Sequence, residues 1–218
     1  MIYSIIFLAL AFILLYSANL NNILGYLLLW VAFDFIIISI GYLGAGHSIF
    51  QKNIYGKIPF YIKLIYLPYM LFSSLIWHLY KITINEKPYN KISNDIIIGR
   101  YLLKDEIPDG ITNYIDLTAE LEEPNNVLSM NYICLPILDG SIPSSKDLEI
   151  ALSKMKHGIT YIHCAQGHGR TGLIAIILLK TQNKITTFEE GLTLLKDFRP
   201  NIELNRNQKK FANQYFTT

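Results

Sequence analysis

Charged residues are nearly absent from the first 51 positions of this chain, where Asp34 is the only Asp, Glu, Lys or Arg. Hydrophobic residues make up 51% of the 218 residues and charged residues 17%, which is apolar for a soluble protein. The skew is local, because residues 92–218 carry 13 Lys or Arg and 15 Asp or Glu. The chain has no basic stripe of the kind that nucleic-acid binding requires, so we expect no nucleic-acid partner.

Cysteine is also scarce, since the chain has only Cys134 and Cys164 and no C-x-x-C pair. This excludes a disulfide scaffold and a cysteine zinc site, and we expect neither a metal nor another cofactor. We interpret Cys134 as a buried core thiol. A regulatory disulfide with Cys164 is the second interpretation, because the sequence does not give the separation of the two thiols.

Two long apolar runs fill the uncharged N-terminal region. Residues 2–18 and 23–43 are each about long enough to cross a bilayer as a helix, and a short Asn-rich break separates them. We predict a transmembrane helical hairpin over residues 1–43. A signal peptide is the competing interpretation of residues 1–18, but the start lacks Lys and Arg and a second apolar run follows at once, which favours a retained anchor.

A third apolar stretch, residues 58–80, is interrupted by Lys63 and Pro68 and is rich in aromatic residues suited to a membrane interface. We predict that residues 44–91 form a basic juxtamembrane, interfacial segment, with a third membrane span as the alternative. With two spans, all the lysines of this segment lie on one side, which the positive-inside rule places in the cytoplasm and where they would attract anionic lipid. These lysines are Lys52, Lys57, Lys63, Lys81, Lys87 and Lys91.

Asp34 lies in the middle of the second apolar run, where a carboxylate is costly to bury. A substrate or proton role is one interpretation. We favour a neutral side chain, or one hydrogen-bonded to the first helix through Ser4 or Tyr16, because the first 51 residues offer no partner charge.

From about Ile92 the pattern becomes that of an α/β domain, which we place at residues 92–218. Short apolar segments bounded by turn residues predict strands, and amphipathic or apolar segments with capping residues predict helices between them. We expect a small central parallel or mixed sheet flanked by helices. The predicted strands are 96–98, 113–117, 132–135 and 159–163, and the predicted helices are 145–157 (Ser144 and Asp147 at its start), 171–180, 187–198 (capped by Thr187 with Glu190) and one that begins at Asn205.

One stretch carries the chemistry: residues 163–172 read His-Cys-Ala-Gln-Gly-His-Gly-Arg-Thr-Gly. A strand, a tight loop and a helix N-terminus together make a phosphate-binding cradle of backbone N–H groups. Gly167 and Gly169 permit the strained backbone that such a cradle needs. Arg170 offers a planar fork for phosphate oxygens, and the same field should lower the pKa of Cys164 so that its thiolate can attack phosphorus.

The pattern His163-Cys164-x5-Arg170-Thr171 resembles the signature loop of the cysteine-dependent protein tyrosine phosphatase superfamily. The resemblance covers about residues 92–216, and the loop is similar to that of the dual-specificity branch. It implies that Cys164 forms a phosphocysteine, that Arg170 binds the phosphoryl group, that Thr171 assists the leaving sulfur and that His163 helps to hold the thiolate. The substrate-binding loop would consist of Ala165, Gln166, Gly167, His168, Gly169 and Arg170.

The resemblance also requires a general acid, an Asp upstream of the cysteine. Asp139 fits, because it follows the strand at 132–135 in the turn Leu138-Asp139-Gly140. Asp147 is the alternative, but it reads as a residue of the first helical turn. A simple turn residue is the other interpretation of Asp139.

Other residues resemble parts of bacterial membrane proteins that carry a dual-specificity-like domain behind hydrophobic segments. These are residues 116–120 and residues 56–68. Asp116 and Glu120 either touch substrate or form a strand-end turn, which we favour. Arg199 is expected to be structural, with or without contact to the site. His168 either assists a second phosphate or acidic head group or is an exposed loop residue.

We therefore predict an integral membrane phosphatase whose catalytic domain faces the cytoplasm. A phosphoprotein is the preferred substrate, because the loop has no Lys or Arg before Arg170. A lipid phosphate, such as a phosphoinositide or phosphatidylglycerophosphate, is the alternative. A silent phosphate-binding membrane module is the alternative from another class, and a sulfurtransferase is disfavoured by the Arg170-Thr171 ending. The sequence leaves the oligomeric state open.

Overall fold

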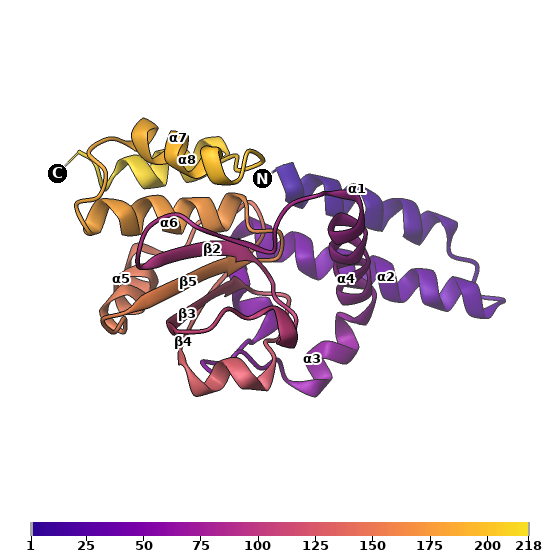
Figure 1. Ribbon diagram of the computed structural model, residues 1–218. Helices are drawn as coiled ribbons and strands as arrows, with labels where there is room; N and C mark the ends of the chain where they lie inside the picture. Colours follow the sequence, from indigo (N-terminus) through magenta and orange to yellow (C-terminus); the bar gives the residue numbers. More distant parts are fainter. Residues whose placement is uncertain (1, 218) are drawn as a thin grey trace.

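A five-stranded mixed sheet forms the centre of the α/β domain in the computed structural model, which describes residues 2–217 (Figure 1). The strands lie in the order β1-β2-β5-β3-β4, and β1 is antiparallel to β2 while the other pairs are parallel. The predicted α/β fold with a mixed sheet is confirmed. Three-residue β1 was not predicted, because so short a segment shows no period-2 pattern. The strands are β1 (Tyr89–Lys91), β2 (Ile96–Arg100), β3 (Ile111–Thr118), β4 (Asn131–Ile137) and β5 (Ile159–Cys164).

One face of the sheet is apolar and is covered by α6, with α7 and α8 beyond it in Figure 1. Alternate strand residues such as Ile115, Leu117 and Ile162 bury their side chains there. The predicted caps are confirmed, since Ser144 Oγ accepts from the Asp147 N–H at 3.0 Å and Thr187 Oγ1 from the Glu190 N–H at 3.1 Å. The helix predicted at 145–157 is shorter than expected. The helices are α5 (Ser145–Ser153), α6 (Gly169–Thr181), α7 (Phe188–Phe198) and α8 (Arg206–Asn213).

The opposite face carries aromatic and polar side chains, among them Tyr114, Tyr161 and His163. The chain between residues 51 and 58 packs on this face, where Gly56 leaves no room for a side chain: a Cβ there would lie 2.2 Å from the Tyr132 hydroxyl. Two short 3-10 helices, Lys104–Glu106 and Asn125–Ser129, belong to the loops around the sheet.

The N-terminal region folds as two apolar helices, α1 (Ile2–Ser17) and α2 (Ile23–Ile40), which lie side by side in Figure 1. Ser4 Oγ and Ser39 Oγ are 2.9 Å apart and join them. The chain continues from α2 through a π turn (Gly41–Ala45) and a 3-10 helix (Gly46–Phe50). Within residues 2–217, Ile23–Phe50 is the one helical stretch long and apolar enough to cross a membrane, since α1 spans only about 24 Å.

The apolar stretch at 58–80 forms two helices, α3 (Phe60–Ile65) and α4 (Leu67–Thr83). They break at Tyr66, just before Pro68, because proline cannot donate a backbone hydrogen bond and is tolerated in a first turn. The Tyr69 N–H at the start of α4 donates to Asp34 Oδ2 at 2.8 Å. The predicted partner of Asp34 on the first helix is therefore wrong.

Three of the six lysines of residues 44–91 pair with acidic side chains. The Lys52 side chain is 0% exposed and its Nζ is 2.5 Å from Asp116 Oδ2. Lys63 pairs with Glu122 at 3.3 Å and Lys81 with Glu106 at 3.1 Å. The predicted attraction to lipid head groups is wrong for Lys52, because its side chain is buried against the sheet.

Candidate active site

The candidate nucleophile, Cys164, is buried at the carboxyl end of β5, and a four-residue loop connects it to α6. The Gly167 N–H donates to Cys164 Sγ at 3.3 Å. Gly167 has a φ of +81°, and a Cβ there would lie 2.5 Å from the Gly99 carbonyl of β2. Only glycine fits this position. Gly169 has no such constraint, since a Cβ there would meet nothing closer than 3.4 Å, so the prediction that it relieves strain is wrong.

Arg170, in the first turn of α6, is buried and bound along one edge. Its Nη1 donates to Glu120 Oε2 at 3.1 Å and to the Ile137 carbonyl at 2.8 Å, and its Nη2 donates to Glu120 Oε1 at 2.9 Å. Among the described residues, its Nε has no hydrogen-bond partner. A buried charged donor without a partner is costly, so this edge of the guanidinium is the place to receive an oxyanion.

The candidate general acid, Asp139, lies beside this arginine. Its Oδ1 is 3.3 Å from Arg170 Nη2, while its side chain is 66% exposed and therefore free to move. Asp147 lies in the α5 cap, where its Oδ2 accepts from Ser144 Oγ at 2.6 Å, and it does not line the cavity that Cys164, Arg170 and Asp139 share. The geometry supports Asp139 over Asp147.

Thr171 and His163 differ in what they can reach. Thr171 is fully buried, and its Oγ1 has no hydrogen-bond partner within residues 2–217, so it is available to another group. The His163 ring faces away from the thiol: its Nδ1 lies 3.4 Å from the Cys164 carbonyl oxygen and its Nε2 is 3.5 Å from Glu123 Oε1. Burial lowers the pKa of His163 to about 4, so this ring is neutral at physiological pH.

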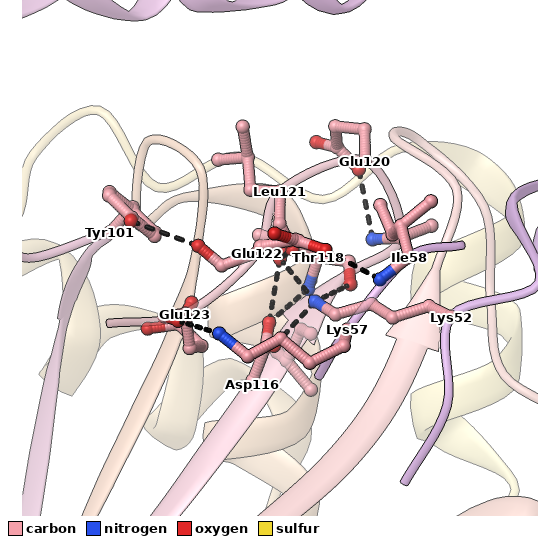
Figure 2. A network of polar contacts seen from close by, with 12 residues as sticks. Lys52, Lys57, Ile58, Tyr101, Asp116, Thr118, Glu120, Leu121, Glu122 and Glu123 are labelled. Atoms are coloured by element: carbon pink, nitrogen blue, oxygen red, sulfur yellow. Dashed lines mark hydrogen bonds and ion pairs between the residues drawn. The ribbon is translucent and has the colours of Figure 1, made fainter. Parts of the chain in front are cut away.

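Asp116 lies in a buried polar network with Lys52 and Thr118 (Figure 2). Its Oδ2 accepts from Lys52 Nζ at 2.5 Å and from the Tyr132 hydroxyl at 2.6 Å, and its Oδ1 accepts from the Thr118 N–H at 2.8 Å. Burial alone would raise the pKa of Asp116, but the Lys52 ammonium holds it below its usual value. Asp116 thus binds Lys52 from within β3, and Glu120, which follows the strand, binds Arg170 and lines the pocket.

The same network contains the residues that could together ligate a metal. Oxygen or nitrogen atoms of Asp116, Glu123 and His163 lie within 4.8 Å of one another. Burial and the charge of Asp116 raise the pKa of Glu123 well above its usual value, so that group favours the neutral form. The Lys52 ammonium already neutralises Asp116, and we assign no metal site.

The segment before β1 supports the phosphate loop from outside. Trp77 Nε1, on α4, donates to the Ala165 carbonyl at 3.1 Å (the indole reaches the loop residue next to Cys164). Sequence reasoning missed Trp77, because an aromatic residue in an apolar stretch was read as a membrane-interface residue. No local pattern distinguishes these two roles.

His168 is held by the same segment. Its Nε2 lies 2.9 Å from Glu86 Oε2 and 3.1 Å from the Tyr80 hydroxyl, and its side chain is 13% exposed. The interpretation of His168 as an exposed loop residue is therefore wrong. Arg199 donates to Glu86 Oε2 at 2.6 Å and to the Gln166 carbonyl at 3.2 Å, so it is structural and contacts the loop.

Cys134 cannot reach Cys164 without backbone movement. Cys134 on β4 pairs with Asp116 on β3, which pairs with His163 on β5, so the two cysteines lie two strands apart. At about 4.8 Å per strand they are about 10 Å apart, beyond the reach of a disulfide. Both thiols are free, Cys134 is half-buried, and burial raises its pKa to about 11.

A pocket of about 210 Å³ opens above Cys164 and Arg170. The loop residues from Ala165 to Arg170, apart from the buried Gly167, form its floor together with Cys164, and Glu120 and Asp139 line one side. Its other wall belongs to the N-terminal region, namely Tyr3, Phe7, Tyr42, Tyr69, Phe72, Ser73, Ile76 and Trp77. Three of the five predicted catalytic residues, Cys164, Arg170 and Asp139, thus face one cavity, while His163 and Thr171 lie outside its lining.

Comparisons relate this chain to known phosphatases. Residues 100–183 match the model of a family described as "Polymorphic toxin system, DSP-PTPase phosphatase". The chain is 29% identical to the protein 067L of Invertebrate iridescent virus 3, whose name describes a tyrosine phosphatase. That alignment covers 58% of this chain and 64% of the relative, so the chain spans less than two thirds of the relative's length.

Two crystal structures share the fold. The active form of Tk-PTP is 19% identical with a TM-score of 0.53, and the alignment covers 60% of this chain and 97% of that one. A human tyrosine phosphatase-like serine/threonine/tyrosine-interacting protein is 17% identical with a TM-score of 0.53, and that alignment covers 61% of this chain and 97% of that one. At these identities the likeness concerns the fold alone.

Proposed function

We propose that this chain, whose α/β domain belongs to the protein tyrosine and dual-specificity phosphatase family within the cysteine-dependent superfamily, hydrolyses phosphomonoesters through a phosphocysteine intermediate. The observation that carries the proposal is the convergence of Cys164, Arg170 and Asp139 on one pocket. A nucleophile, an oxyanion binder and a carboxyl group there provide the parts of a two-step hydrolysis.

In the first step the Cys164 thiolate attacks phosphorus. An S–P bond forms as the bond to the leaving oxygen breaks, and Asp139 gives that oxygen its proton. The Arg170 guanidinium and the loop N–H groups bind the phosphoryl oxygens, where negative charge gathers in the transition state.

In the second step water attacks the phosphocysteine. Asp139 takes a proton from this water, the S–P bond breaks, and phosphate and thiolate are released. The unpartnered hydroxyl of Thr171 is proposed to donate a hydrogen bond to the departing sulfur. The role proposed for His163 is to shape the loop through its buried ring, since it makes no hydrogen bond to Sγ within the described residues.

The Asp139 side chain must also move away from Arg170 when substrate binds. Arg170 Nη2 already donates to Glu120 and lies 3.3 Å from Asp139 Oδ1, while its Nε has no partner within residues 2–217. A bidentate phosphate needs Nε together with Nη2, so Asp139 has to leave the guanidinium as substrate enters. Its exposed side chain makes that movement cheap.

We also propose a membrane anchor of the bacterial type, with the domain on the cytoplasmic side. The apolar stretch Ile23–Phe50 supports an anchor, and the free state of both cysteines suits a reducing compartment. We keep three proposed divisions of the chain, namely the hairpin of residues 1–43, the interfacial segment 44–91 and the catalytic domain 92–218. Since α4 contacts the phosphate loop, the middle division also serves the site.

Turnover of a small aryl phosphate by the full chain in detergent tests the proposal. We expect activity that Cys164→Ser and Arg170→Met each abolish. Cys164→Ser changes one buried atom, and its thermal unfolding should match that of the native chain. Activity that survives Cys164→Ser contradicts the proposal, and tight phosphate binding without turnover would favour the silent binding module.

A further inference from the structure

We propose that the substrate is a lipid whose head group carries a single phosphomonoester and no second anionic group. This inference rests on the proposed function, since it names what that pocket would hydrolyse. It departs from the phosphoprotein preferred from the loop sequence, and three features of the pocket carry it.

The first feature is an aromatic wall facing the catalytic loop. Tyr3 and Phe7 of α1 contact Tyr42, with ring centroids 5.2 Å and 5.9 Å apart, and Phe7 contacts Tyr69 of α4 at 6.1 Å. Phe72 continues this wall along α4. A phosphate at Cys164 therefore has aromatic side chains beside it in the same pocket.

The second feature is that the wall runs into an apolar outer surface. Phe72 and Ile76 line the pocket and are still 51% and 41% exposed, and Leu75 between them is 55% exposed on the outside. On α1, Ile5 is 64% exposed. Exposed apolar side chains beside a pocket suit contact with a partner or membrane. Acyl chains can lie along it while the phosphate of the same molecule reaches the loop.

The third feature is the scarcity of positive charge at the mouth. Arg170 and His168 are the only basic side chains that line the pocket within residues 2–217. His168 is held by Glu86, and Arg170 is faced by Glu120 and Asp139. Nothing is left to neutralise a second phosphate or an acidic peptide, so a lipid with one phosphomonoester fits better than a phosphoinositide with several.

Helix α1 also contacts the loop that carries Asp139. Tyr3 packs against Gly140, where a Cβ would lie 2.7 Å from its ring, and Gly140 follows Asp139 in sequence. Insertion of α1 into a lipid layer therefore positions the general acid as well as the substrate. This contact ties the site to the surface from which a lipid would arrive.

Phosphate release by the full chain in nanodiscs tests the inference. The probes are long-chain phosphatidic acid in phosphatidylcholine, its water-soluble short-chain analogue, a phosphatidylinositol bisphosphate in the same bilayer, and a phosphotyrosine peptide. We expect kcat/KM for long-chain phosphatidic acid to exceed that for each other probe at least tenfold.

Phe72→Ser should lower the ratio of long-chain phosphatidic acid to aryl phosphate turnover about tenfold. The matched control is Phe198→Ser, which removes an exposed phenyl ring from α7, outside the pocket, and should leave this ratio unchanged. Equal effects of the two substitutions, or a higher kcat/KM for the phosphopeptide or the bisphosphate lipid, overturn the inference. Aryl phosphate turnover that depends on Cys164 would in that case still support the proposed function.

Discussion

Two buried ion pairs flank the carboxyl end of β3, and they differ in whether a ligand can enter. Lys52 and Asp116 are both 0% exposed and are enclosed by Thr118 and Tyr132. Arg170 and Glu120 are nearly as buried, yet they line a pocket, and Arg170 keeps an unpartnered Nε. We call them the closed pair and the open pair.

The difference lies in the spare hydrogen-bonding capacity of the cation. The three donors of Lys52 find Asp116 Oδ2, the Thr118 carbonyl and Thr118 Oγ1 at 2.5–3.0 Å, so the closed pair is complete by itself. The open pair is incomplete until an oxyanion arrives. One pair therefore fastens the N-terminal segment to the sheet, and the other is built to exchange a partner.

The largest expected effect comes from breaking the closed pair. Lys52→Met leaves the Asp116 carboxylate buried without a cation, and we expect the free energy of unfolding to fall by about 3–5 kcal/mol. Adding Asp116→Asn to Lys52→Met should recover part of that loss. Denaturant unfolding measures both, with Lys87→Met as the exposed control that stays within about 0.5 kcal/mol. A native-like unfolding midpoint for Lys52→Met would show that the pair is not structural.

The acid beside the open pair gives the next largest effect. Asp139→Asn keeps the shape of the side chain but removes the proton donor, so we expect kcat to fall about 100-fold or more. Substrates with good leaving groups should lose less, because they need less help from an acid. Asp147→Asn is the comparison, since its side chain serves only the α5 cap, and its kcat should be native. A larger kcat loss in Asp147→Asn would reverse the assignment.

Removing the acid of the open pair should have an effect that a ligand can repair. Glu120→Gln leaves the Arg170 charge poorly compensated and should cost about 1–3 kcal/mol of stability. Inorganic phosphate can take the place of the lost charge, so it should raise the melting temperature more in Glu120→Gln than in the native chain. In Asp116→Asn, phosphate should give no such extra shift. Equal shifts in both variants would erase the distinction between open and closed pairs.

The most gradual effect is a pH dependence of stability. Burial lowers the pKa of His163 to about 4 in the folded chain, against about 6.5 when unfolded. The stability from its neutral form is present above pH 6.5 and is lost as the pH falls toward 4, because the unfolded chain then binds the extra proton. The slope is at most about 1.4 kcal/mol per pH unit. Unfolding measured from pH 7 to 4.5 should show a shallower slope in His163→Gln, and an unchanged slope would exclude His163 as the source.

The sequence predicted the apolar face of the sheet well, because local patterns determine it. Strands β2 to β5, the helices behind them and the Ser144 and Thr187 caps follow from alternation and capping residues near in sequence. The phosphate loop was found for the same reason, since its cysteine, glycines and arginine lie within seven consecutive positions.

The polar face and the pocket wall could not be predicted from local patterns. Lys52 meets Asp116 across 64 positions, and Trp77 meets Ala165 across 88. The local sequence around a lysine beside an apolar run is the same whether the lysine faces lipid head groups or a buried carboxylate. Asp34 was misassigned in the same way, because its partner, the Tyr69 N–H, is a backbone group that no side-chain pattern reveals.

The most direct test of the account is the phosphoenzyme itself. Intact-protein mass spectrometry after rapid quenching with an aryl phosphate should show one added phosphoryl group, located on Cys164 by peptide mapping. It should accumulate further in Thr171→Ala, where the sulfur leaves without its hydrogen bond. Turnover with no phosphoryl adduct on Cys164, or an adduct that persists in Cys164→Ser, would contradict hydrolysis through phosphocysteine.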